Sequence, residues 1–133
     1  MNVRSGKVIY DGKYEVEFDT ESLFGLIEKL GIEDKGAAEV LAETVICYAA
    51  EPEQNAYKVY EYVAKGRGIK KYAVSMRIKR AIDAAEQNGQ LKFIDCYIPG
   101  TYYDYDYGYT NKELIAIVKD YLVDTGRIRV TKL

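Results

Sequence analysis

The chain has 133 residues, a formal net charge of −2, no histidine and two cysteines, and 48% of its residues are hydrophobic. This length predicts a single domain, residues 1–133, that is large enough to bury a core without metals or disulfides. Because histidine is absent, serine–histidine and cysteine–histidine nucleophiles are excluded, and so is the usual general base at neutral pH.

The two cysteines, Cys47 and Cys96, make neither a disulfide framework nor a zinc site, so we interpret both as small buried residues. No phosphate-binding glycine loop is present, and "GRG" at 66–68 is only a turn signal. We therefore expect neither an enzyme nor a bound cofactor or metal. No apolar run approaches the roughly 18 residues of a membrane span, and the start of the chain lacks a signal-peptide core, which predicts a soluble, cytoplasmic protein.

The first expected element is a β-hairpin over 7–18. Its sequence alternates around Asp11-Gly12, a two-residue turn signal in which both positions need positive φ. An isolated hairpin is marginal in water, so it must pack on the domain or gain a third strand. The β-prone C-terminal segment 126–133 could supply that strand. The residues expected to line the hairpin are Val8, Tyr10, Tyr14 and Val16.

Helical sequence fills the chain between these segments. Gly31 fits a helix stop, and Pro52 fits the first turn of a helix, where its missing N–H costs nothing. Thr110 and Glu113 have capping-box spacing. The helices predicted in chain order span 20–31, 34–51, 52–65, 73–88, 91–97 and 110–126.

These elements predict a mainly α domain of about six helices, including a helix-turn-helix, with a small β-hairpin at its N-terminus. We divide it into an N-terminal hairpin (1–19), a helical core (20–126) and a C-terminal strand or tail (127–133). The chain shows no internal repeat and no linker that would separate a second domain.

The helix predicted over 73–88 has two distinct faces. At 100° per residue one stripe is apolar and must face the core, while the opposite side is polar and partly basic. The apolar stripe consists of Val74, Ile78, Ala81, Ile82 and Ala85. The outward residues are Met76, Arg80, Asp83 and Gln87, flanked by Arg77 and Lys79.

Basic residues are concentrated around this helix. Residues 58–80 hold eight basic residues and one acid, a net charge of +7, so the rest of the chain carries −9. A segregated basic zone is what a phosphate-binding surface requires. A helix, a glycine-containing turn and a second helix with a basic outer face are the parts of a helix-turn-helix. The turn, roughly 66–72, is longer than the three or four residues of the compact type.

Five stretches in register resemble the C-terminal DNA-binding effector domain of the stage 0 sporulation protein A family, the sporulation initiation response regulators of endospore-forming bacteria. The resemblance covers about three quarters of the chain, from Leu23 to Leu122. Each stretch alone is a weak signal, and their order and spacing make it specific. The stretches are "IEKLGI" (27–32), "KGAAEVLAETVICYA" (35–49), "KVYEYVAK" (58–65), "RIKRAIDAAEQNG" (77–89) and "TNKELIAIVKDYL" (110–122).

The resemblance implies a six-helix fold whose third and fourth helices form a helix-turn-helix and whose last helix can contribute to dimer contacts. Arg77 and Arg80 match family arginines that contact bases or phosphates. Lys79 stands where the family has a base-contacting glutamate, and Asp83 where it has an arginine, so the family's own operator is not expected.

The function we predict is a DNA-binding transcriptional regulator that reads the major groove of double-stranded DNA with helix 73–88. The base-reading residues would be Met76, Arg77, Lys79, Arg80, Asp83 and Gln87. The phosphate-binding residues would be Lys65, Arg67, Lys70 and Lys71. A homodimer through helix 110–126 would suit paired half-sites, although this helix could equally be buried within one chain.

An alternative is a protein–protein interaction module on the same fold that has lost or altered DNA binding, motivated by Lys79 and Asp83. Loop 101–109 holds five of the chain's 14 tyrosines. It could pack alternate tyrosines on the domain, form a protein interface or stack on bases. Asp104 and Asp106 argue against the last, because they would repel phosphates.

Overall fold

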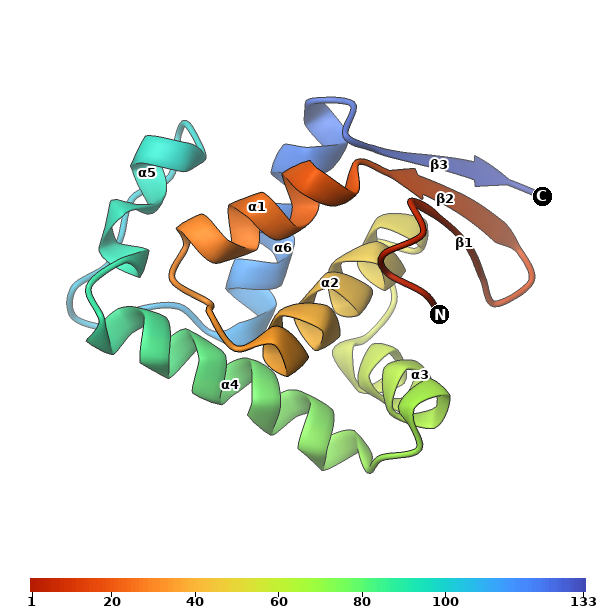
Figure 1. The fold of residues 1–133 in the computed structure, drawn as a ribbon, viewed down its shortest axis with the longest axis horizontal. Helices are drawn as coiled ribbons and strands as arrows, with labels where there is room; N and C mark the ends of the chain where they lie inside the picture. Colours follow the sequence, from red (N-terminus) through yellow and green to blue (C-terminus); the bar gives the residue numbers. More distant parts are fainter.

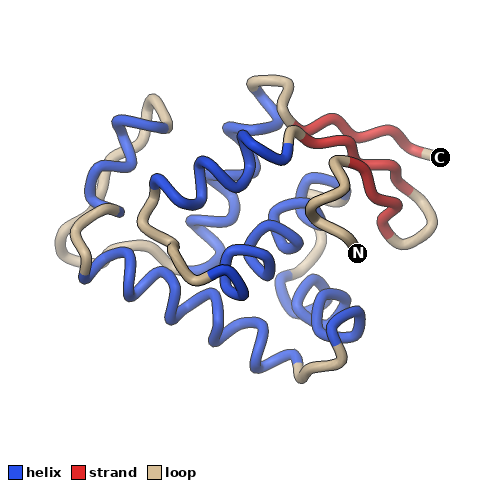
Figure 2. The backbone as a smooth tube through the Cα atoms, in the orientation of Figure 1, coloured by secondary structure: helices blue, strands red, loops and turns tan.

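A three-stranded antiparallel sheet joins the two ends of the chain. The computed structural model describes residues 1–133 and contains β1 (Lys7–Tyr10), β2 (Tyr14–Phe18) and β3 (Ile128–Lys132) in the order β1-β2-β3. Val16 of β2 lies opposite Val8 of β1 and Val130 of β3. The predicted hairpin and the C-terminal strand are therefore confirmed. Both chain ends lie near this sheet, at one end of the molecule (Figures 1 and 2).

The hairpin turn uses the two residues that the sequence singled out. Asp11 and Gly12 have φ of +52° and +66°, and the Lys13 N–H donates to the Tyr10 carbonyl at 3.0 Å. However, Tyr10 pairs with Tyr14, so the connection has three residues and the predicted two-residue loop is wrong by one. Lys13 is the additional residue, and its carbonyl accepts a hydrogen bond from the Leu133 N–H at 2.8 Å, which ties the C-terminus to the turn.

Helices make up most of the rest, so the prediction of a mainly α fold is confirmed. A short 3₁₀ turn, η1, directly precedes the fifth helix. The helical elements are α1 (Thr20–Lys29), α2 (Lys35–Ala50), α3 (Ala56–Arg67), α4 (Lys71–Gln87), η1 (Leu91–Phe93), α5 (Ile94–Tyr97) and α6 (Asn111–Asp124).

Helix α2 is the centre of the domain. It is buried on almost every side, from Ala37 to Ala50, and α1, α3, α4, α6 and the sheet all pack on it. Its five alanines let neighbouring helices approach closely, whereas Leu41 and Ile46 fill the space between them. Figure 1 shows α2 in the middle of the view, with α4 along one long edge and α3 beside the start of α4.

Helix ends follow local chemistry. The side chains of Asp19, Asp34 and Asn55 each accept a backbone N–H at the start of α1, α2 and α3. At α6 the predicted capping box is confirmed: the Thr110 hydroxyl accepts the Glu113 N–H, and the Glu113 carboxylate accepts the Thr110 N–H. Gly31, with φ +98°, follows the end of α1 as predicted.

Two local predictions were wrong. Pro52 lies in a turn before α3, not in its first turn, because Asn55 provides the cap and α3 begins at Ala56. Cys47 is buried as predicted, but Cys96 is exposed on the short helix α5. No helix is both long enough and apolar enough to cross a membrane.

Candidate nucleic-acid interface

The connection between α3 and α4 is short. Helix α3 ends at Arg67, and Gly68 adopts φ +66°, the left-handed conformation that ends many helices. The half-buried Ile69 then donates its N–H to the Ala64 carbonyl at 3.0 Å. Because α4 begins at Lys71, only Gly68, Ile69 and Lys70 form the turn. The expected long turn over 66–72 is wrong, and the three-residue turn is that of a compact helix-turn-helix.

The apolar stripe of α4 anchors the helix as predicted. Val74, Ile78, Ala81, Ile82 and Ala85 are all buried, and the helix packs against α2, α3 and α6. Fully burying a side chain such as Ile78 or Ile82 contributes about 1.5–3 kcal/mol relative to leaving it exposed. Because this stripe is held in the core, the opposite face of α4 is fixed toward solvent.

The predicted base-reading residues share the outer side of α4. None of them enters the core, and neither Arg77 nor Arg80 forms an ion pair or hydrogen bond within the chain. Their guanidinium groups therefore remain available to an external acceptor. The exposed members of the set are Arg77, Lys79, Arg80 and Gln87, and the half-buried members are Met76 and Asp83.

Lys79 and Asp83 contact each other. The Lys79 Nζ lies 3.5 Å from the Asp83 carboxylate, one helical turn further along α4. Both side chains are about half exposed, and a surface pair of this kind is worth about 0–1 kcal/mol. The ion pair can therefore break at little cost in free energy. While it is formed, each side chain partly neutralises the charge of the other.

The start of α4 concentrates positive charge. Lys70 is the N-cap residue, its side chain makes no cap hydrogen bond, and the first turn contains no acid. Lysines near the positive end of a helix dipole destabilise it by about 0.3–1 kcal/mol each. The Lys71 Nζ lies 3.1 Å from the centroid of the Tyr57 ring, which holds this cation at the junction of α3 and α4. These lysines are unfavourable for the stability of the helix, but they give the N-terminal end of α4 a positive potential that attracts anions.

Arg67 has a different environment from the other predicted phosphate-binding residues. Its guanidinium lies 2.5 Å from the carboxylate of Glu43, which is buried in α2, and its Nε is buried without an acceptor. Burial raises the pKa of Glu43, and Arg67 opposes that shift. Arg67 therefore ties α3 to α2, whereas Lys65 and Lys70 are exposed without an ion pair and Lys71 contacts only an aromatic ring.

A small concavity separates α4 from the start of α2. Its volume is about 380 Å³, and Arg77 and Arg80 line one side while Asp34 and Gly36 line the other. Asp34 caps α2 by accepting the Ala37 N–H at 2.8 Å. The two arginines thus lie next to the N-terminus of a second helix, on the same side of the molecule as the outer face of α4.

Sequence reasoning missed two tyrosines at this surface. Tyr72 lies in the first turn of α4 and is 72% exposed, and Tyr57 lies in the first turn of α3 and is 60% exposed. Tyr72 precedes Met76 by four residues, which places both on the same face of the helix. The spacing was visible in the sequence, but the predicted helix began at 73 and left Tyr72 in the turn.

Helix α6 and the tyrosine loop (residues 100–109) fix the position of α4 through side-chain hydrogen bonds. The Asn111 side-chain amide donates to the Ser75 carbonyl of α4 at 3.0 Å and to the Tyr60 hydroxyl of α3 at 3.4 Å. Further along α4, the Tyr103 hydroxyl donates to Glu86. These contacts link both helices of the helix-turn-helix to the last helix of the domain.

The apolar side of α6 is buried within its own chain. Leu114, Ile115, Val118 and Leu122 belong to the core, so they are not free for contacts with a second copy. Of the apolar residues of α6, Val123 is the most exposed, at 38%. A homodimer through residues 110–126 would have to use the remaining, mainly polar side of the helix.

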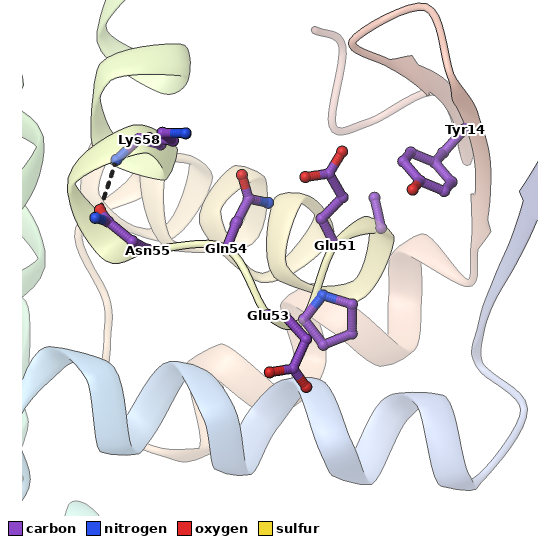
Figure 3. A pocket seen from close by; sticks show the side chains of 8 residues that line it. Tyr14, Glu51, Glu53, Gln54, Asn55 and Lys58 are labelled. Carbon is purple, nitrogen blue, oxygen red and sulfur yellow. Dashed lines mark hydrogen bonds between the residues drawn. The ribbon is translucent and has the colours of Figure 1, made fainter.

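A larger concavity lies elsewhere. A pocket of about 650 Å³ opens between β2 and the loop that joins α2 to α3, and Tyr14, Glu51, Glu53 and Lys58 are among its lining residues (Figure 3). Its two glutamates give it an acidic rim. Figure 3 shows Glu51 directed toward the side of Tyr14, with Glu53 pointing away from it. No group of three or more Cys, Asp and Glu side chains is arranged to hold a metal ion.

Comparison of the chain with protein-family models and with curated protein sequences finds no match.

Proposed function

We propose that this protein is a sequence-dependent DNA-binding transcriptional regulator that inserts α4 into the major groove. The observation that carries the proposal is the compact α3–turn–α4 unit, whose outer face presents Arg77 and Arg80 without any partner in the chain. Free guanidinium forks on a rigid helix suit the paired O6 and N7 acceptors of guanine.

The positive start of α4 supports the same docking. In this proposal Lys65, Lys70 and Lys71 bind phosphates on either side of the groove, while Met76, Lys79, Asp83 and Gln87 accompany the arginines toward base edges. Phosphate contacts set the position of the helix and base contacts supply the sequence preference. Arg67 acts indirectly by fixing α3 against α2 through Glu43.

The resemblance to the sporulation regulator's effector domain also supports the proposal. Lys79 and Asp83 invert the charges of the matched family positions, and here the two side chains form an ion pair with each other. The inversion exchanges a base-contacting acceptor for a donor, so we propose a DNA site different from that of the family.

The test is a fluorescence-anisotropy titration of the protein against a labelled random-sequence duplex pool at salt concentrations from about 50 to 200 mM. We expect log affinity to fall linearly with log salt, and the Arg77→Ala/Arg80→Ala protein to bind more weakly at every salt. The matched control is Arg129→Ala, which removes an exposed arginine from the sheet, remote from α4. Absence of binding at the lowest salt, or equal losses in both variants, would contradict the proposal. Selection of a preferred site from the same pool then tests sequence dependence.

A second candidate function is a protein–protein interaction module on the same fold. It is favoured by the Lys79–Asp83 pair, which reduces the charge offered to DNA, and by exposed tyrosines in the α5–α6 loop. No retention on DNA at low salt, together with a stoichiometric protein complex that survives Arg77→Ala/Arg80→Ala, would favour this function. Sedimentation equilibrium of the free protein and of a Val123→Glu variant tests the homodimer through α6.

A further inference from the structure

The tyrosine loop forms a pocket against α6 that the DNA-binding surface does not use. The pocket has a volume of about 510 Å³. Ile117 of α6 contributes apolar surface, and tyrosine rings and two carboxylates complete the lining. The residues that matter for its chemistry are Tyr102, Asp104, Tyr107, Tyr109, Glu113 and Ile117.

Hydrogen bonds within the loop define its shape. The Asp104 Oδ1 accepts the N–H groups of Asp106 and Tyr107 at 2.9 and 3.2 Å, and the Asp104 carbonyl accepts the Gly108 N–H at 2.7 Å. The Tyr109 hydroxyl donates to the Tyr102 carbonyl. These contacts close the loop into a compact turn, so the pocket exists before any ligand arrives.

The loop is also fastened to α4. Tyr103 stacks edge-on against Tyr105 and Tyr109 and donates its hydroxyl to Glu86. Gly108, with φ +65°, lies so close to Glu86 that a Cβ there would be 2.2 Å from a carboxylate oxygen. Tyr103 and Tyr109 are thus the packed members of the loop, whereas Tyr102, Tyr105 and Tyr107 are 76%, 77% and 89% exposed. Of the alternatives considered for this loop, packing of tyrosines on the domain therefore describes Tyr103 and Tyr109 but not Tyr105 and Tyr107.

The pocket carries uncompensated negative charge. One oxygen of Asp104 and one of Glu113 bind backbone N–H groups, and no lysine or arginine pairs with either carboxylate. The pKa of Tyr109 is raised, first by burial and then by the negative charge of Glu113, which indicates the sign of the local field. Phosphates are repelled here, so nucleic acid is not the occupant.

We propose that this pocket binds an arginine side chain on a basic segment of a partner protein. A guanidinium plane can lie against the faces of Tyr102, Tyr107 or Tyr109 while its N–H groups donate to the free oxygens of Asp104 and Glu113. The hydrocarbon part of the arginine side chain fits against Ile117. Arginine is favoured over lysine because its flat group both stacks on rings and donates along a fork.

The test uses two variants that remove charge but keep the local hydrogen bonds. Asp104→Asn retains a side-chain oxygen for the N–H groups of Asp106 and Tyr107, and Glu113→Gln retains the capping box, which accepts either residue. The control is Asp106→Asn, which removes one charge from the same loop at a residue outside the pocket lining. Unchanged circular dichroism and melting temperature show that each variant is folded.

The probe is a fluorescein-labelled peptide of glycine, serine and two arginines, compared with the same peptide carrying neutral citrulline. We expect the arginine peptide to bind and the citrulline peptide to lose at least about tenfold in affinity, because the cation–π and ionic contacts both need the charge. We expect a similar loss for Asp104→Asn/Glu113→Gln with the arginine peptide, and less than about a twofold loss for Asp106→Asn, whose charge is partly screened by salt.

No binding of the arginine peptide, equal binding of citrulline, or an equal loss in the Asp106→Asn control overturns the proposal. A Tyr107→Leu variant tests the contribution of the Tyr107 ring separately. We expect this variant to bind the arginine peptide more weakly than the wild type does. DNA titration of Asp104→Asn/Glu113→Gln separates this inference from the proposed function, since the pocket variants should bind duplex DNA as the wild type does.

Discussion

The carboxylate of Glu43 and the guanidinium of Arg67 form an ion pair at 2.5 Å, linking the middle of α2 to the last residue of α3. Glu43 is almost completely buried, whereas about a quarter of the Arg67 side chain remains exposed. The pair lies directly before the turn of the helix-turn-helix. It therefore connects the central helix of the core to the element that sets the direction of α4.

Removing one partner of this pair should destabilise the protein. We expect Glu43→Ala to lower the free energy of unfolding by about 3 kcal/mol at pH 7, the lower end of the range for broken buried pairs, because Arg67 is partly exposed. Glu43→Gln should cost less, since its amide oxygen can still accept from Arg67. Chemical denaturation measures both, and equal effects of the two variants would contradict this account.

The same pair predicts a pH dependence. Burial raises the folded-state pKa of Glu43 above its unfolded value of about 4.5. The part of the unfolding free energy that is linked to protonation of Glu43 is therefore fully present below the unfolded pKa and is lost as pH rises through the folded pKa. The difference in unfolding free energy between wild type and Glu43→Gln should shift in favour of the wild type as pH falls from 7 to 4. A difference that is constant with pH would show that the pKa is not shifted.

Gly31 should be intolerant of any side chain. Its φ is +98°, and a Cβ would lie 2.6 Å from the Gln90 Cβ and 3.2 Å from the Ala85 Cβ. We expect Gly31→Ala to destabilise the fold by more than about 2 kcal/mol, from combined backbone strain and overpacking. The control is Gly25→Ala inside α1, where nothing lies within 4 Å and a gain of about 0.5–1 kcal/mol is expected. Thermal melts of the two variants should move in opposite directions.

Arg80 and Lys70 should affect DNA binding in different ways. Under the proposed docking, Arg80→Ala should cost about 1–3 kcal/mol of affinity for the preferred site and relax specificity at one position. Lys70→Ala should weaken all sequences alike and reduce the salt slope by about 1. Lys132→Ala, an exposed lysine of β3, is the matched control for Lys70→Ala. The docking model fails if Lys70→Ala changes sequence preference or if Lys132→Ala has the same effect on the slope.

Breaking the Lys79–Asp83 pair should strengthen DNA binding with little effect on stability. We expect Asp83→Asn to change the free energy of unfolding by less than about 1 kcal/mol, because the pair is exposed. Affinity for the random duplex pool should rise, and the salt slope should steepen by about 1, because Lys79 becomes free to contact a phosphate or base. Unchanged affinity would indicate that this side of α4 does not face DNA.

The sequence by itself determined the elements whose signals lie within a few residues of one another. Asp11-Gly12 can adopt positive φ without reference to the rest of the chain, and Thr110 and Glu113 cap each other across one turn. The apolar stripe from Val74 to Ala85 follows from helical periodicity alone. The mainly α class and the inward face of α4 were therefore predictable from local chemistry and spacing.

Only the tertiary structure decided which polar groups remain free. Arg67 and Arg77 look alike in a basic stretch, but Arg67 meets Glu43, 24 positions earlier in the chain, and Arg77 meets no acid. The pocket between the tyrosine loop and α6 likewise depends on Tyr103 reaching Glu86. The physical reason is that helix caps and turns are closed by neighbours along the chain, whereas ion pairs and pockets depend on distances between segments that only the packing of the whole domain sets.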